Sequence, residues 1–186
     1  MLSFHLLLPR IKKHTMKNMK IVLGAAVLLF VGTTSFAQTE NIVGVAAGNE
    51  NFSTLVTAVK AADLVGTLSS DGPFTVFAPT NDAFAKLPDG TVSSLLTPES
   101  KVALTGVLTY HVLAGKFEAA AVIDAIKKND GAFVVETVQG GTISLSLEGD
   151  KVVLTDAKGG KSTVVIADVA ASNGVIHAID SVVMPK

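Results

Sequence analysis

The 186-residue sequence contains no cysteine. This absence excludes disulfide-linked scaffolds, thiolate zinc sites, iron–sulfur clusters and cysteine nucleophiles. A collagen-like or coiled-coil period is also missing, whereas 48% of the residues are hydrophobic, which is too many for a disordered chain. The composition therefore predicts a folded protein that does not depend on thiol chemistry.

Acidic residues are missing from the start of the chain. The first 20 positions hold five of the 15 basic residues, and all 16 acidic residues come later. Residues 38–186 then carry 10 lysines against 16 acidic residues, a net charge near −6. Since proteins bind nucleic acids largely by neutralising phosphates, we expect no nucleic-acid partner.

The N-terminal segment has the pattern of a secretory signal peptide. Lys17 and Lys20 precede an apolar run of 11 residues, 21–31, and small residues then occupy the −3 and −1 positions of a cleavage site after Ala37. The run is too short to span a bilayer comfortably as a retained anchor. We therefore expect a mature N-terminus at Gln38.

The predicted signal peptide also determines where we expect the mature protein and whether we expect a membrane anchor. No other segment approaches 18 uninterrupted apolar residues and no cysteine follows the signal, so we expect neither a transmembrane nor a lipid anchor after cleavage. We expect a bacterial protein in the periplasm, at the cell surface or in the medium. Residues 1–37 are then the signal peptide and 38–186 a single domain, with translation starting at Met1, Met16 or Met19.

Two different periods divide the rest of the chain. Helical spacing of apolar residues dominates 41–128, and one strand interrupts it at 74–79, where Pro79 ends the strand. From residue 132 the period changes to two, which predicts strands at 133–138, 142–148, 151–155, 161–166 and 175–184. Helices followed by strands, without strict alternation, predict an α+β domain.

Three segments resemble the signature motifs of the fasciclin-like domain family. They are Thr75–Phe84 (TVFAPTNDAF), Leu108–Leu113 (LTYHVL) and Ser172–Pro185 (SNGVIHAIDSVVMP), in the family's order. The chain resembles a single-domain secreted bacterial member. The resemblance implies a wedge-shaped β-sandwich with a packed layer of helices. It also implies an adhesion or extracellular-matrix role, which in animal members has been linked to integrin recognition by the Tyr-His segment.

Few residues could carry chemistry. His111 and His177 are the two histidines after the expected cleavage site, and neither has a third metal ligand at short spacing. Buried neutral histidines bonded to the backbone explain both positions better than a metal pair or a general base. Ser172, His177 and Asp180 contain the residue types of a hydrolase triad, but no nucleophile elbow accompanies them. We expect no enzyme activity, no metal and no cofactor.

The signature motifs also have structural interpretations. Tyr110 and His111 are either a partner-binding surface or a fold-determining pair, and their apolar neighbours favour burial. Asn173-Gly174 is typical of a tight turn with positive φ angles. The motif residues that we interpret as fold determinants are Phe77, Pro79, Thr80, Asn173, Gly174, His177 and Asp180.

A cluster of acidic residues near the predicted hairpins could attract a cation. The cluster consists of Glu148, Asp150 and Asp156, and its spacing matches no calcium-binding loop. We therefore expect these carboxylates at solvated hairpin ends.

A non-enzymatic module for cell adhesion or another surface interaction is the function that these patterns favour. Its expected partner is an unknown protein or carbohydrate at the cell surface, and we expect the chain to be a monomer. A small-ligand or sugar-binding accessory protein of the cell envelope stays open as the alternative. A deep apolar pocket with convergent polar groups would favour that alternative.

Overall fold

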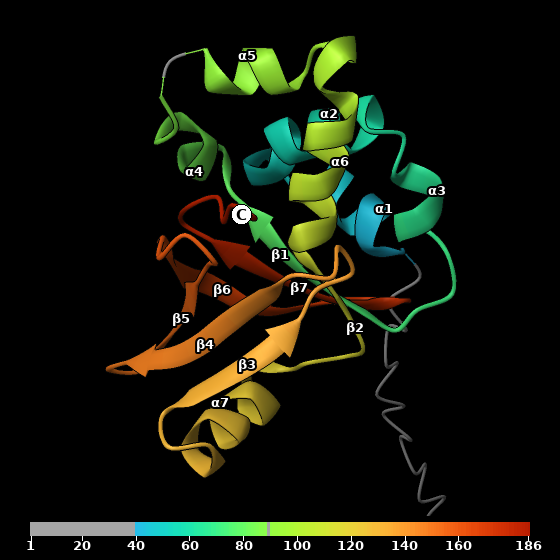
Figure 1. The fold of residues 1–186 in the computed structure, drawn as a ribbon. Helices are drawn as coiled ribbons and strands as arrows, with labels where there is room; N and C mark the ends of the chain where they lie inside the picture. The colour runs from blue at the N-terminus through green and yellow to red at the C-terminus, as the bar shows by residue number, and fades with distance from the viewer. Residues whose placement is uncertain (1–39, 89) are drawn as a thin grey trace, which may run out of the picture. The chain divides into compact units, whose positions relative to one another are not determined.

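The computed structural model describes residues 40–88 and 90–186 (Figure 1). The predicted signal peptide and its cleavage site lie outside these ranges. Within them, no helix combines the length and the apolar character that a membrane span requires. The described residues form a layer of short helices and one strongly bent sheet.

Helices fill most of the first half of the described chain, as the helical spacing predicted. They are α1 (Ile42–Ala47), η1 (Glu50–Phe52), α2 (Ser53–Ala61), α3 (Val65–Leu68), α4 (Asn81–Ala85), α5 (Thr91–Leu95), η2 (Pro98–Ser100) and α6 (Lys101–Tyr110), where η marks a 3₁₀ turn. α7 (Ala119–Lys128) lies apart from this group (Figure 1). Polar side chains cap the start of two of the α-helices, because Asn41 accepts from the Gly44 N–H (2.9 Å) and Thr80 from the Ala83 N–H (3.3 Å).

Seven strands form one sheet in the order β2-β1-β7-β6-β5-β4-β3. Their bounds are β1 (Phe74–Pro79), β2 (Val112–Ala114), β3 (Ala132–Glu136), β4 (Thr142–Glu148), β5 (Lys151–Thr155), β6 (Lys161–Ala171) and β7 (Gly174–Ile179). β1 and β7 pair in parallel, whereas the other neighbouring strands are antiparallel. The first and third signature motifs, far apart in sequence, therefore lie side by side in the sheet.

β6 carries the bend of the sheet. Its residues 161–163 pair with β5, its residues 164–171 pair with β7, and two register shifts interrupt the second pairing. At the ends of the sheet, the Val138 N–H donates to the Val112 carbonyl oxygen (2.8 Å), so the sheet nearly closes on itself. The predicted α+β class is confirmed, and the two halves of the bent sheet correspond to the layers of the predicted sandwich.

Three predicted strand ends are wrong by two residues or more. The strand expected at 133–138 ends at Glu136. The strand expected at 161–166 continues to Ala171, because bulges carry it past the point where the alternation ends. The strand expected at 175–184 ends at Ile179, and the residues after it are held by side chains.

Hydrophobic residues form two clusters on opposite faces of β1 and β7. Val76 and Ile176 pack against the helical layer, whereas Phe77 and Ile179 pack inside the bent sheet together with α7. Successive side chains of a strand point to opposite faces, so both faces of these central strands are covered. All six residues of β7 are buried. The signature motifs thus occupy the centre of the domain.

Candidate functional site

The Tyr-His pair lies where α6 ends and the chain enters β2. Tyr110 is the last residue of α6, and His111 caps its C-terminus. Both side chains are buried, with 0% and 2% of the residue surface exposed. A docking surface made of these rings would need both to be accessible, so their burial favours the fold-determining interpretation.

His111 uses both ring nitrogens inside the protein. Nδ1 lies 2.8 Å from the Val107 carbonyl oxygen, and Nε2 lies 3.2 Å from the Val183 backbone nitrogen. Because the Val183 N–H can only donate, Nε2 accepts and Nδ1 carries the proton, which makes the ring neutral. Burial lowers the pKa of His111 from 6.5 to about 4, although the Val107 carbonyl and the Asp156 carboxylate act in the opposite direction.

The Tyr110 hydroxyl connects α6 to two distant parts of the sheet. It donates to the Thr142 carbonyl oxygen (2.6 Å) and accepts from the Ala157 N–H (3.2 Å). Burial raises the pKa of Tyr110 and outweighs the hydrogen bond from Ala157, which lowers it; the Asp156 carboxylate raises it further. The phenol is therefore a structural donor and acceptor.

His177 is fully bonded at the centre of β7. Its Nε2 donates to the Phe117 carbonyl oxygen (2.7 Å), its Nδ1 accepts from the Asp168 N–H (3.2 Å), and the residue is 3% exposed. The ring also packs against Phe77, with 5.7 Å between the ring centroids. Neither Ser172 nor Asp180 hydrogen-bonds to this ring, so the structure does not assemble the three as a triad.

The predicted tight turn is present, since only Ser172 and Asn173 separate the paired residues Ala171 of β6 and Gly174 of β7, but neither Asn173 nor Gly174 has the predicted positive φ. The Asn173 side chain also makes contacts over long sequence distances. Its Oδ1 accepts from the Ile42 N–H (2.9 Å), and its Nδ2 donates to the carbonyl oxygens of Leu68 and Ser70 (both 2.9 Å). This amide fixes α1 and the end of α3 to the start of β7.

Gly174 is required by a close approach of two strands. It pairs with Phe74 at the start of the parallel β1–β7 ladder. A Cβ atom at this position would overlap the Phe74 carbonyl oxygen and would lie 2.9 Å from Cδ1 of Ile42. Glycine is therefore required here because any side chain would collide with β1. Local turn patterns in the sequence do not reveal this constraint.

Asp156 is buried, which corrects its expected place at a solvated hairpin end. Its Oδ1 accepts from the N–H groups of Lys158 (2.9 Å) and Gly160 (2.7 Å), and its Oδ2 accepts from the Met184 N–H (2.9 Å). Backbone donors thus replace water around the carboxylate. The two local bonds form an Asx-type turn. The sequence could have indicated this turn, because Asp156 lies shortly before Gly159 and Gly160, between two predicted strands. Glu148 and Asp150 are exposed, as expected.

Side chains hold the chain after β7, a feature that the sequence analysis missed. The Ser162 hydroxyl donates to the Ser181 carbonyl oxygen (2.8 Å) and accepts from its N–H (3.2 Å). His111 accepts from the Val183 N–H, and Asp156 accepts from the Met184 N–H. Residues 181–184 therefore belong to the folded domain without being part of a strand.

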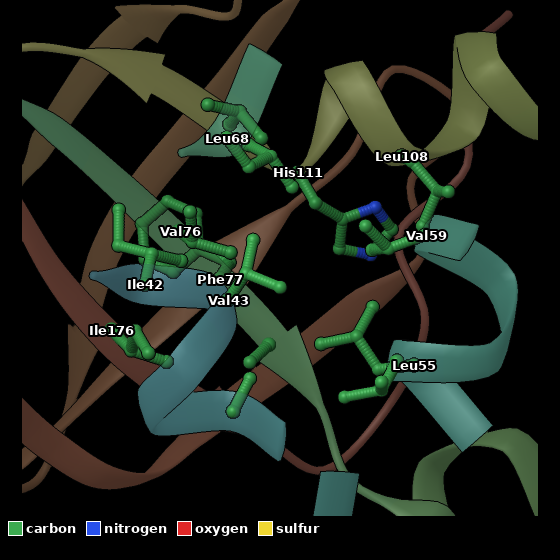
Figure 2. A pocket seen from close by; sticks show the side chains of 14 residues that line it. Ile42, Val43, Leu55, Val59, Leu68, Val76, Phe77, Leu108, His111 and Ile176 are labelled. Carbon is green, nitrogen blue, oxygen red and sulfur yellow. The ribbon is translucent and has the colours of Figure 1, made fainter. Parts of the chain in front are cut away.

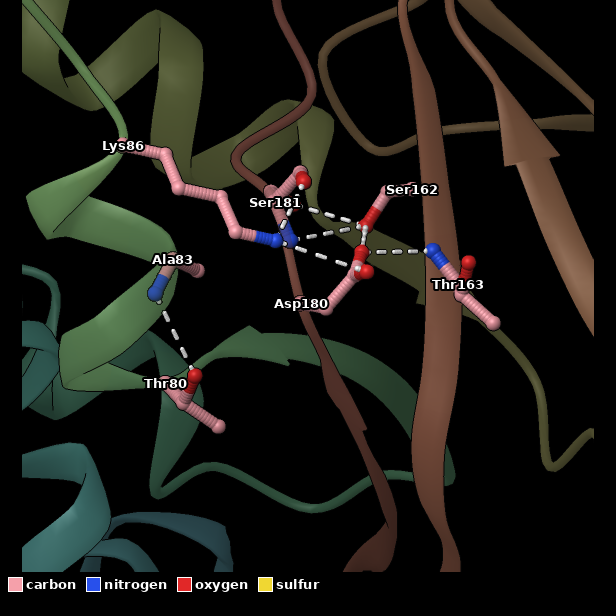
Figure 3. A network of polar contacts seen from close by, with 7 residues as sticks. All are labelled: Thr80, Ala83, Lys86, Ser162, Thr163, Asp180 and Ser181. Atoms are coloured by element: carbon pink, nitrogen blue, oxygen red, sulfur yellow. Dashed lines mark hydrogen bonds and ion pairs between the residues drawn. The ribbon is translucent and has the colours of Figure 1, made fainter.

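Asp180 lies in a partly exposed polar network (Figure 3). Its carboxylate accepts from the Thr163 N–H (2.8 Å) and forms an ion pair with Lys86 (3.5 Å). Partial burial raises the pKa of Asp180, but the Thr163 N–H, Lys86 and Ser181 together outweigh it and place the pKa below its usual value. The carboxylate is thus ionised and bonded within the domain.

Removing Asp180 from this network is expected to lower the free energy of unfolding more than removing Lys86. Asp180→Ala should lower the free energy of unfolding by about 1–2 kcal/mol, since the Thr163 N–H loses its acceptor. Lys86→Met should cost less than about 1 kcal/mol, because the lysine end of the ion pair is exposed to solvent. Urea unfolding at pH 7 measures both, with Lys116→Met as control for another exposed ion pair. A larger loss in Lys86→Met than in Asp180→Ala would contradict this account.

A small cavity lies between the helical layer and the sheet (Figure 2). Its volume is about 30 Å³, and its walls are apolar side chains from α1, α2, α6 and the central strands, including Ile42, Leu55 and Val76. Pockets for small ligands usually measure roughly 300–1,000 Å³. His111 also lies on the wall, but both of its nitrogens are already bonded. This cavity therefore gives no support to the small-ligand alternative.

A comparison with known protein families supports the resemblance that the motifs of the central strands indicated. A model of the family described as "Fasciclin domain" matches residues 50–185. The chain belongs to the fasciclin domain family. The match contains all three motifs that carried the resemblance.

Several relatives of this fasciclin domain cover most of its length. The protein sll1483 of Synechocystis sp. is 56% identical over 144 residues, which are 77% of this chain and 73% of that protein. The immunogenic protein MPB70 of Mycobacterium bovis is 39% identical over 149 residues, 77% of this chain and 68% of that protein. Human periostin is 34% identical over 136 residues, 73% of this chain but 15% of periostin.

A solved structure confirms the fold of the fasciclin domain. The FAS1 domain pair of the insect cell adhesion molecule Fasciclin I superposes with a TM-score of 0.67, at 19% sequence identity. The match covers 76% of this chain and 50% of the domain pair. At this identity the likeness establishes the fold alone.

The chemistry available to the fasciclin domain is limited by its own hydrogen bonds. Within residues 40–88 and 90–186, no group of three or more histidine, cysteine, aspartate or glutamate side chains is placed to hold a metal ion. His111, His177 and Asp156 are each committed to backbone partners. These hydrogen bonds position the two central strands, β1 and β7, and the chain that follows β7.

Proposed function

We propose that this chain is a secreted, non-enzymatic fasciclin domain that binds a protein or carbohydrate at the cell surface, in cell adhesion or a related contact. The observation that carries this proposal is the internal use of both buried histidines, which leaves neither ring free to act on a substrate. The signal-like pattern in residues 17–37 supports export. The adhesion role of the insect Fasciclin I structure is consistent with a binding function.

A cell-binding experiment tests this proposal. The full chain is expressed in a bacterial host, purified from the periplasm or medium, and labelled with a fluorophore. We expect saturable binding to cells of the source organism in flow cytometry, with competition by excess unlabelled protein. We also expect hydrolysis of ester, phosphate and glycoside test substrates at the rate of buffer alone. Binding that does not saturate, or turnover that follows the purified protein, would contradict the proposal.

A further inference from the structure

The two end strands of the sheet, β2 and β3, meet at one point and then separate. They are joined by the bond from the Val138 N–H to the Val112 carbonyl oxygen (2.8 Å). Beyond that bond lies a surface hollow of about 470 Å³, which we call the β2–β3 slit. The residues that line it are Ala114, Phe117 and 133–138. The rings of Phe117 and Phe133, 6.4 Å apart between centroids, pack against each other there.

Backbone groups of β3 point into this slit. The Thr137 N–H donates to Gly141, across the β3–β4 hairpin (2.8 Å), whereas the next N–H, that of Val138, points to β2. Because bonding direction alternates along an antiparallel strand, the N–H and C=O groups of Val134 and Glu136 point away from β4. Among the described residues they have no neighbouring strand, since β3 is the end of the sheet.

The opposite rim of the slit has the same property. The His111 carbonyl oxygen accepts from the Phe77 N–H of β1 (2.9 Å), and the Gly115 N–H donates to Pro73, the residue just before β1 (2.9 Å). The alternation therefore turns the peptide groups of Ala114 away from β1 and toward the slit. Two unpaired strand edges thus face one hollow, which is the geometry that accepts an added strand.

The β3 edge has one charged residue, Glu136, but it lacks the bulges, proline and lysine that protect many exposed strand edges. Val134 is 59% exposed and Val138 46% exposed, and β3 contains neither proline nor lysine. β6 provides the contrast, because its edge at 165–171 is interrupted by register shifts. There Asp168 has a positive φ and accepts from the Ala119 N–H of α7 (2.8 Å). Bulges of this kind block strand addition at β6 but not at β3.

The side chains on the outer face of β3 define what could bind. Val134, Glu136 and Val138 lie two residues apart on one face, so they present an apolar, acidic, apolar row. Glu136 is exposed and has no ion-pair partner within 40–88 and 90–186. Its carboxylate, in a domain of net charge near −6, favours a basic side chain opposite it.

We propose that the β2–β3 slit binds an extended segment of a partner protein, which adds a strand to the β3 edge. The added strand places an apolar side chain beside Val134 and a lysine or arginine beside Glu136, while Val138, whose N–H is bonded to Val112, closes the slit at that end. This inference rests on the proposed binding function and names the site and the partner chemistry for it.

A designed peptide tests the slit directly. The probe is a capped seven-residue peptide, threonine at odd positions and valine, lysine and valine at the even ones. Titration of the purified protein, followed by NMR, should shift amide signals of 112–117 and 132–138. At a peptide concentration about ten times Kd, hydrogen exchange of the Val134 and Glu136 amides should slow roughly tenfold. Shifts elsewhere only, or unchanged exchange at both amides, would overturn the proposal.

Two variants separate backbone pairing from charge recognition. Val134→Pro removes an N–H that points into the slit and not toward β4, so it should abolish peptide binding while the sheet is retained. Glu136→Lys should reverse the preference, so that a peptide with central glutamate binds and the lysine peptide does not. Glu99→Lys, the same charge change on the helical side, should leave the preference unchanged. Equal binding of both peptides to Glu136→Lys would argue against the assigned register and overturn the proposal.

The outcome also separates this inference from the proposed function. If wild type binds cells and Val134→Pro binds them equally well, the binding function stands and the slit is wrong. If wild type does not bind cells at all, the proposed function fails whatever the peptide does. If the protein self-associates in sedimentation with the same two amides protected, the slit's occupant is a second copy, and the peptide proposal is overturned.

Discussion

Replacing His111 with alanine is expected to lower the free energy of unfolding by about 2–4 kcal/mol at pH 7.5. The substitution removes a fully buried ring and leaves a cavity at the end of α6. It also leaves the Val183 N–H without its acceptor and the Val107 carbonyl without its side-chain donor. Urea unfolding of the two proteins measures the difference.

The pH dependence of this difference has a definite sign. The pKa of His111 is about 4 in the folded protein, below its value of 6.5 in the unfolded chain. The unfolded state therefore binds more protons between these values. The contribution of the neutral ring to stability is complete above pH 6.5 and is lost as the pH falls toward 4, by about 3 kcal/mol in total.

A second pH therefore provides the control for this prediction. At pH 5.5 the wild type should have lost roughly 1.4 kcal/mol through His111, a loss that His111→Ala cannot show. Other titrating groups are common to both proteins, so the gap between them should be smaller at pH 5.5 than at pH 7.5. His111→Gln, which can still donate and accept but does not titrate, should be less destabilised and equally free of this pH effect. Equal unfolding midpoints for wild type and His111→Ala at both pH values would refute the structural role of the ring.

Gly174→Ala is expected to destabilise the domain by about 3 kcal/mol or more, a large effect for one methyl group. The added Cβ would overlap the Phe74 carbonyl oxygen, which belongs to the backbone of β1 and cannot turn aside as a side chain could. The two parallel strands would have to separate at the start of their ladder. Circular dichroism during thermal unfolding measures the loss.

Gly106→Ala is the matched control for this substitution. Gly106 lies inside α6, and nothing lies within 4 Å of the Cβ that alanine would add. Alanine is the better helix former there, so a stabilisation of about 0.5–1 kcal/mol is expected. The same sign of change in both variants would show that the close approach of β1 and β7 does not explain Gly174.

Local patterns in the sequence were sufficient for the class of the fold and for the two histidines. The change from helical to alternating period gave the order of helices and strands, because each pattern reflects a single buried face. The apolar residues around His111 predicted its burial for the same reason, and the structure agrees. Whether the Tyr-His pair serves only the fold stays a prediction, for the His111 variants to test.

The predictions from the sequence were wrong or incomplete where a residue's partners lie far away in the chain. Asn173-Gly174 has the composition of a tight turn and lies at one, but the Asn173 amide also binds α1 and the end of α3, and Gly174 makes room for β1. Asp156 looked like a solvated residue because its third donor, the Met184 N–H, lies 28 positions away. The bend in β6 also depends on which strand pairs with each half. None of these partners is specified by neighbouring residues.

The bonds that hold residues 181–184 make the C-terminal end of the domain part of its core. A deletion after Ile179 would remove no strand, yet it would take away the donors that His111 and Asp156 bind. Two buried acceptors would then lack partners, so this truncation acts as a core mutation and not as the trimming of a tail. In a protein with several fasciclin domains built in this way, the flexible connection to the next domain can begin only after the position of Met184.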